Sequence, residues 1–443
     1  MSTDLTASPP AATEVHRYAE ALLAHLAANG TAPPAAPGFR DIPGYWLPPA
    51  VEALAAILSG ADPLEPLSRA AGRDQQRTAL FLCLALAVSG QGSRIHASWL
   101  GTAFGELSLD RPVTHGQRSL WLAAARGAYG PAGKIFVLRK LDALAVPDHA
   151  PPDQWIQALV PGEPSVVVPP SLADFPEMAE IPELARPSMA ADRLARLRGR
   201  CAEITSARQA EHRSSPPLDN PSGTPAATWA DNEPLAVLRS LIGLGGPAGP
   251  MASLSTYLLD DLRPGADPHL AAIALHVAAP ILRGVAEELE ADSRQEPPDT
   301  LTVPLLGHRI HLRPEGPDQS SLAAAENAIV TEGAVPRPRP WAAMALIVVG
   351  VACLAGAVAA TSLLAAAGVA MIGLAGWQLW QRRKLIEADA RFVAAQVSEL
   401  KELADGAVWA LHAYGREADV RATQAADDAA ELTRLIRRGP RAA

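Results

Sequence analysis

The sequence predicts a mainly α-helical protein: helical domains with Pro-rich connectors, a small β-hairpin, a two-span transmembrane helical hairpin and a long C-terminal helix. Three observations support this prediction. The 443 residues are 49% hydrophobic but only 5% aromatic, and their apolar residues recur largely at helical spacing. Forty-one prolines and 33 glycines divide the chain, so long uninterrupted strands or helices should be few. Residues 341–380 contain no charge, which is typical of membrane-spanning helices.

The N-terminal third is predicted to form one helical domain. Residues 1–10 are expected to be disordered, and helices should follow one another over residues 11–145. The run 79–88 is apolar on every side and too short to cross a membrane, so it predicts the central core helix. Thr114 and Gln117 form a T-x-x-Q capping box, which predicts the start of a further helix.

The middle of the chain alternates connectors with helical segments. Many prolines make residues 146–187 a connector, and residues 188–213 read as an amphipathic helix with arginines beside its apolar stripe. Such a helix can lie on an anionic membrane surface, but nearby acidic residues fit a helix packed within the protein, and both interpretations stay open. A flexible linker is predicted at 214–234 and a Pro/Arg tether at 332–340. Between them, residues 235–331 are predicted to form a second small domain. It should contain helices near 235–243, 251–262 and 267–291 and a β-hairpin at 300–312 that turns at Gly307-His308.

The uncharged run predicts two transmembrane helices. As one helix it would be about 60 Å long, twice the roughly 30 Å hydrocarbon core of a bilayer. Thr361 and Ser362 mark the turn, which gives spans at 341–359 and 363–380. Both flanks are basic, so the positive-inside rule places both termini in the cytoplasm. The alternative is a buried apolar hairpin inside a soluble domain.

Two groups of residues are expected to hold this hairpin in the bilayer. Indoles and cations prefer the headgroup region, and the predicted interface anchors are Arg337, Arg339, Trp341, Trp377, Trp380, Arg382, Arg383 and Lys384. Small residues allow helices to approach closely, within the hairpin or between copies, and those in the spans are Ala352, Gly356, Ala360, Gly368 and Gly376.

Residues 381–443 are predicted to contain a long cytoplasmic helix. Apolar residues recur along it at heptad spacing, which favours a coiled coil. The many alanines, together with Gly406 and Gly415, equally favour a helix packed on the protein's own cytoplasmic domain. The main seam residues are Ile386, Val393, Val397, Leu400, Leu411 and Tyr414.

The sequence offers no pattern that carries chemistry. Residues 243–248 nominally fit G-x-G-x-x-A, but they follow a helical segment and contain a proline, so they predict a loop. The pairs His269/His276 and His308/His311 have no cysteine or carboxylate partners at ligand spacing, which favours structural histidines. We therefore expect a protein that is not an enzyme, with no catalytic residue, cofactor or metal.

The cysteine content and the net charge limit which compartment and which partners are expected. Cys83, Cys201 and Cys353 lie far apart, which fits a reducing compartment rather than a disulfide framework. The N-terminus lacks the pattern of a signal peptide, so the N-terminal part is expected in the cytoplasm. A net charge of −9 disfavours nucleic acid as a partner.

These features lead to one main hypothesis and one alternative. The main hypothesis is a membrane-anchored cytoplasmic adaptor or scaffold that recruits a protein partner or a larger assembly to the inner face of the bacterial membrane. Its expected partners are membrane lipid, a cytoplasmic protein and further copies of itself. The alternative is a two-span effector that perturbs the membrane, by pore formation or otherwise killing the cell, when its soluble domain is triggered.

Overall fold

The computed structural model is mainly helical, with 76% helix and 4% strand, which confirms the mainly α-helical part of the prediction. The structure describes residues 9–29, 39, 42–146, 151–162, 167–214, 233–247, 251–332, 344–345, 347–349, 351–352 and 362–438. The predicted linker and Pro/Arg tether fall almost wholly outside these residues, as do the first eight residues of the chain.

The chain folds into two compact units, and each is built from separated stretches of sequence. Unit 1 comprises Met1–Pro164, Ala191–Ala291 and Gln424–Ala443, and unit 2 comprises Ser165–Ala190 and Asp292–Thr423. The range predicted as a second small domain, 235–331, is therefore divided between them. Helices α9 (Pro182–Ser214) and α15 (Ser362–Arg438) each contribute residues to both units.

Unit 1 is all-helical, and α4 (Gln75–Val88) is its central helix. Every residue from Phe81 to Val88 is buried, because this helix has no polar face to present to water. The capping box forms at α6 (His115–Ala125): the Thr114 hydroxyl accepts from the Gln117 N–H, and the Gln117 side chain accepts from the Thr114 N–H. Around them lie α1 (Pro9–Asn29), α2 (Leu47–Ser59), α3 (Leu64–Arg73), α5 (Ala97–Phe104), α7 (Gly130–Asp142), α8 (Pro152–Leu159), α10 (Pro234–Leu241) and α11 (Leu254–Leu262).

Helix α12 (Pro268–Ser293) completes unit 1 and runs through Pro280 as one helix. Its Asp267 cap accepts from the N–H groups of His269 and Leu270. Among the described residues it is the one helix long and apolar enough to cross a bilayer, but 67% of its most apolar window is buried inside the structure. Burial of that kind marks a core helix of a folded unit.

The amphipathic helix predicted at 188–213 lies within α9 and is packed rather than free. Its stripe residues Leu194, Leu197, Cys201 and Ile204 are all buried. Arg198 of α9 pairs at 3.0 Å with the buried Asp428 of α15. The apolar stripe of this helix is therefore packed within the protein, and Arg198 forms an ion pair within unit 1.

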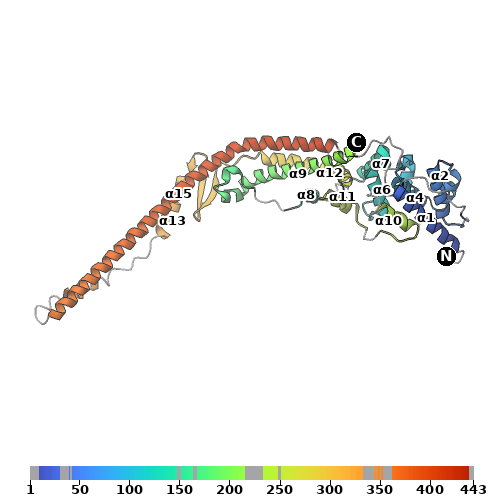
Figure 1. Cartoon of the computed structure of the whole chain (residues 1–443). Coiled ribbons are helices and arrows are strands. Elements are labelled where there is room, and N and C mark those ends of the chain that lie inside the picture. Colours follow the sequence, from blue (N-terminus) through green and yellow to red (C-terminus); the bar gives the residue numbers. More distant parts are fainter. Residues whose placement is uncertain are drawn as a thin grey trace. The chain divides into compact units, whose positions relative to one another are not determined.

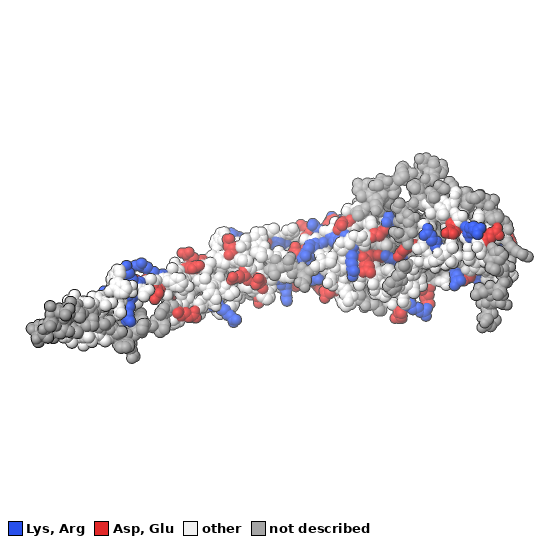
Figure 2. Space-filling view, turned by 60° about the horizontal axis from the view of Figure 1, so that its bottom comes forward, with Lys and Arg blue, Asp and Glu red and all other residues white. Residues whose placement is uncertain are grey.

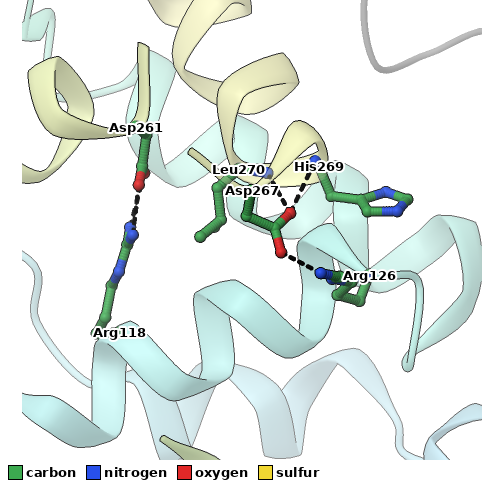
Figure 3. Close-up of polar contacts among 6 residues, drawn as sticks. All are labelled: Arg118, Arg126, Asp261, Asp267, His269 and Leu270. Carbon is green, nitrogen blue, oxygen red and sulfur yellow. Dashed lines mark hydrogen bonds and ion pairs between the residues drawn. The ribbon is translucent and has the colours of Figure 1, made fainter. Parts of the chain in front are cut away.

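Two buried or half-buried ion pairs tie α6 to α11 and α12 (Figure 3). The Arg118 guanidinium donates to both Asp261 oxygens, at 2.7 and 2.5 Å, and the two side chains are only 9% and 6% exposed. Its Cζ also lies 4.8 Å from the ring centroids of Trp121 and Tyr257. Burial alone would lower the pKa of Arg118, but its hydrogen bond to Asp261 raises the pKa above the usual value, so the guanidinium stays charged.

Unit 2 is built around a small sheet. The predicted hairpin forms from β1 (Leu301–Leu305) and β2 (His308–Arg313), and β3 (Gly316–Pro317) adds a third antiparallel strand. The turn lies one residue earlier than predicted, at Leu306-Gly307, whose φ values of 47° and 82° suit a two-residue hairpin loop. His308 is consequently the first residue of β2 rather than a turn residue.

The core of unit 2 joins segments that are remote in sequence. The connector predicted at 146–187 contributes Leu172, Met178 and Leu184 to this core. The sheet, α13 (Gln319–Glu332) and α15 cover them on the other sides, with the buried residues Val303, Ile310, Leu312, Leu322, Ile329, Leu400 and Tyr414 among others. The connector prediction is therefore wrong on both sides of the unit boundary: its later part is built into the core of unit 2, and its earlier part contains α8 of unit 1.

Helix α15 is a single helix of 77 residues (Figure 1). The second predicted span, 363–380, and the predicted C-terminal helix are therefore one continuous element. Of the first predicted span the structure describes only 344–345, 347–349 and 351–352, all helical. The two-span arrangement is consequently not confirmed and remains a proposal.

The ion pair between Arg118 and Asp261 yields a stability prediction. Asp261→Ala leaves a guanidinium buried without its partner, so we expect the free energy of opening of α6 and α11 to fall by about 3–5 kcal/mol. Hydrogen–deuterium exchange on the full chain measures it.

The neighbouring residue provides the control. Asp260 is half exposed and pairs with Arg263 at 3.3 Å on the surface, so Asp260→Ala should cost less than about 1 kcal/mol. Equal effects of the two substitutions would contradict the importance assigned to the buried pair.

Candidate membrane-anchoring surface

Exposed large apolar side chains concentrate in one interval of the chain. More than half of those among the described residues lie between Met344 and Phe392. Figure 2 shows the described surface at the N-terminal end of α15 largely without charge, next to a group of basic side chains. Exposed apolar side chains in this number mark a contact with a membrane or a partner. Those up to Trp380 form the candidate anchoring surface: Met344, Val348, Val349, Val351, Val369, Leu374, Trp377, Leu379 and Trp380. Leu385, Ile386 and Phe392 follow the basic residues on α15.

The predicted interface anchors within α15 lie where this apolar surface ends. Trp377 and Trp380 are each 54% exposed. The Lys384 ammonium lies 3.9 Å from the centroid of the Trp380 ring, a cation–π contact one helical turn apart. Arg383 is exposed, and Arg382 is half-buried and engaged in an interaction of its own. The remaining predicted anchors, Arg337, Arg339 and Trp341, lie outside the described residues.

Of the small residues predicted to pack the spans, the structure describes the surroundings of Ala352 and Gly376 alone. Ala352 and Gly376 are exposed, and Gly368 belongs to α15. A Cβ added at Gly376 would have no atom of the described residues within 4 Å. Gly356 and Ala360 lie outside the described residues, so close packing of the two spans stays a prediction.

The seam of the C-terminal helix is largely occupied within the chain. Leu400, Leu411 and Tyr414 are buried in unit 2, and Val393 and Val397 pack partly against its core. Ile386 stays exposed. Over this stretch the structure therefore shows the second of the two interpretations, a helix packed on its own domain.

Polar contacts and a close approach fix this packing. The Tyr414 hydroxyl donates to the Leu184 carbonyl at 2.8 Å, and Lys401 pairs with Glu326 of α13 at 3.0 Å. A Cβ at Gly406 would come within 2.9 Å of the Phe175 ring, so the glycine that interrupts the heptads is what admits this ring.

Unit 2 also holds an open polar cavity of about 460 Å³ beside β2 and α13. His308, Arg309, His311, Ser320 and Ser321 line it. Several of these groups already have structural partners: His311 Nδ1 lies 2.9 Å from the Thr302 hydroxyl, and the Ser321 hydroxyl accepts from the His311 N–H. Within the described part of the chain, no three His, Cys, Asp or Glu side chains are arranged to hold a metal ion.

The described cysteines are poor nucleophiles. Burial raises the pKa of both Cys83 and Cys201 to about 12, so neither thiol ionises appreciably at neutral pH. The nominal glycine motif also behaves as predicted where it is described: Gly243 and Gly245 form a turn after α10, not after a strand. Comparison with known proteins adds no assignment, since no protein-family model, curated protein or solved structure matches the chain.

Replacing a seam residue by alanine should have different effects on stability at the two ends of the seam. Leu400→Ala removes a fully buried side chain from unit 2 and should destabilise it by about 2–5 kcal/mol. Ile386→Ala, at an exposed position of the same helix, should change stability by less than about 0.5 kcal/mol. Hydrogen–deuterium exchange of β1 and β2 in the full chain reports the difference. A larger effect at Ile386 would show that its exposed state is not the native one.

Proposed function

We propose that this protein is a non-enzymatic, membrane-anchored adaptor that recruits a protein partner or a larger assembly to the inner face of the bacterial membrane. The observation that carries the proposal is the exposed apolar surface between Met344 and Trp380, bordered by Arg382, Arg383 and Lys384 on the same helix that packs into unit 2. The proposed topology has two spans and both termini in the cytoplasm.

The dimensions of α15 support the anchor. From Ser362 to Trp380 the helix covers nineteen residues, about 28 Å, close to the roughly 30 Å of a hydrocarbon core. Trp377 and Trp380 would then lie at the headgroups, and the basic residues just beyond them on the cytoplasmic side. The preceding apolar residues, near 341–359, would return the chain to the same face.

The adaptor part of the proposal draws support from an exposed tryptophan in unit 2. Trp409 is 70% exposed, and the Arg416 guanidinium lies 5.9 Å from its ring centroid. The exposed Val420 follows at a spacing that puts all three on one face of α15. Tryptophan and arginine dominate binding energies at protein interfaces.

Membrane anchoring is tested by charge insertion. In the double variant Val348→Arg/Val369→Arg, each arginine should oppose insertion by about 2.5–3.5 kcal/mol, because it would lie near the middle of a proposed span. We expect the full chain to shift from the carbonate-resistant membrane pellet to the soluble or aggregated fraction.

Two exposed apolar residues outside the surface serve as the matched control. Leu64→Arg/Val168→Arg should leave the chain in the membrane pellet. If the first variant also stayed there, or if the wild-type chain were soluble, the anchor would be refuted.

Adaptor function is tested by crosslinking in cells, followed by purification of the full-length chain. A foreign protein should be recovered in stoichiometric amount, and Trp409→Ala should weaken its binding by about 2 kcal/mol, roughly thirtyfold. Leu64→Ala, which changes an exposed residue of unit 1, should leave recovery unchanged. Recovery of no protein other than the chain itself would contradict the adaptor.

One observation favours the alternative, a membrane-perturbing effector. Gly373 and Gly376 lie on α15 with no described atom within 4 Å of an added Cβ, so further helices could assemble closely there. Under this alternative, the full-length chain reconstituted in liposomes should release an entrapped dye. Liposomes that stay sealed at high protein loading would speak against it and leave the adaptor in place.

A further inference from the structure

A second apolar face of α15 is exposed within unit 2, directly after the basic residues Arg382, Arg383 and Lys384. Leu385 and Phe392 are 64% and 63% exposed, and Ala388 and Ala395 are exposed between and beyond them. Their spacing of three, four and three residues is that of successive a and d positions of a heptad. We call these four residues the stalk face.

The stalk face is distinct from the seam that unit 2 occupies. The seam runs through Val393, Val397 and Leu400, which turn toward the core of unit 2. Phe392 and Ala395 lie close to these residues in sequence but on another side of the same helix, and both are exposed. Packing among the described residues therefore covers one apolar face of α15 and leaves the other exposed.

The charges beside the stalk face indicate which partner could cover it. With Leu385 at position a, Lys384 takes position g and Asp389 takes position e, and both are exposed. In a parallel pair of helices, position g of one helix faces position e of the next heptad in the other. Lys384 of each copy would thus face Asp389 of the other, which gives two symmetric pairs of opposite charge.

We infer that a second copy of this chain covers the stalk face, as a parallel two-helix contact just above the membrane. The parallel orientation rests on the proposed anchor, because both copies leave the same bilayer face in the same direction. Two heptads alone form a weak contact, and confinement to one membrane raises the effective concentration that such a contact needs.

Cysteine crosslinking of the full chain in its native membranes tests the contact. Ala388→Cys and Ala395→Cys, introduced singly at d positions, should give oxidised dimer at a yield roughly tenfold above the wild-type background. Ala394→Cys is the matched control, since Ala394 is equally an exposed alanine but takes position c, away from the contact. Equal yields at 394 and 395 would indicate random collision, and a crosslink to a foreign protein would indicate another occupant; either would overturn the inference.

Charge reversal tests the register. In the Ala395→Cys background, Lys384→Glu and Asp389→Lys should each lower the dimer yield severalfold, and the double reversal should restore it. Absence of rescue would overturn the proposed register. Fractionation of the same samples separates the two proposals: a chain that stays in the membrane pellet without dimer refutes this inference alone, whereas a chain in the soluble fraction refutes the anchor.

Discussion

Apolar side chains between Met344 and Phe392 impose the constraint on which the remaining interpretation depends. Removing apolar surface from water is worth about 25 cal/mol per Å², so a dozen large exposed side chains in one interval need a cover. In the proposed topology a bilayer covers the part before Trp380, because the length of uncharged helix and the position of the basic residues both agree with it. That bilayer would end near Lys384, and the exposed Leu385 and Phe392 would need a different cover.

The continuity of α15 extends this constraint along the helix into unit 2. A helix without a break keeps its faces in fixed angular order, so the face that packs into unit 2 at Leu400 and Tyr414 determines which face is left exposed nearer Leu385. The heptad pattern in the sequence could not assign these faces, because apolar residues lie on more than one side of the helix. Contacts from outside the helix decide between them: Leu184 at Tyr414 and the Phe175 ring at Gly406 cover the face that is buried.

Local patterns predicted the local structure well. The capping box at Thr114, the core helix in 79–88 and the hairpin at 300–312 depend on residues close in sequence, and all three are present. Unit 2 could not be predicted, because its core joins Leu184 to Tyr414 across more than 200 residues and no periodicity records such a contact. The ion pair between Arg118 and Asp261 could not be predicted from the sequence for the same reason. Helix α13 was also missed, although Asp318, which caps it through the Ser321 N–H, was a signal in the sequence.

A parallel pair of chains would change what the adaptor can bind. Trp409 lies seventeen residues after Phe392 on the same unbroken helix, about 25 Å further along it. A dimer would therefore present two Trp409 surfaces at a height fixed by α15. A partner with a single copy of the matching site would gain nothing from this arrangement, whereas an assembly of repeated subunits would bind both surfaces with increased avidity. The stalk contact, weak by itself, would in turn be strengthened by such a partner, because binding two copies at once lowers the cost of holding them together.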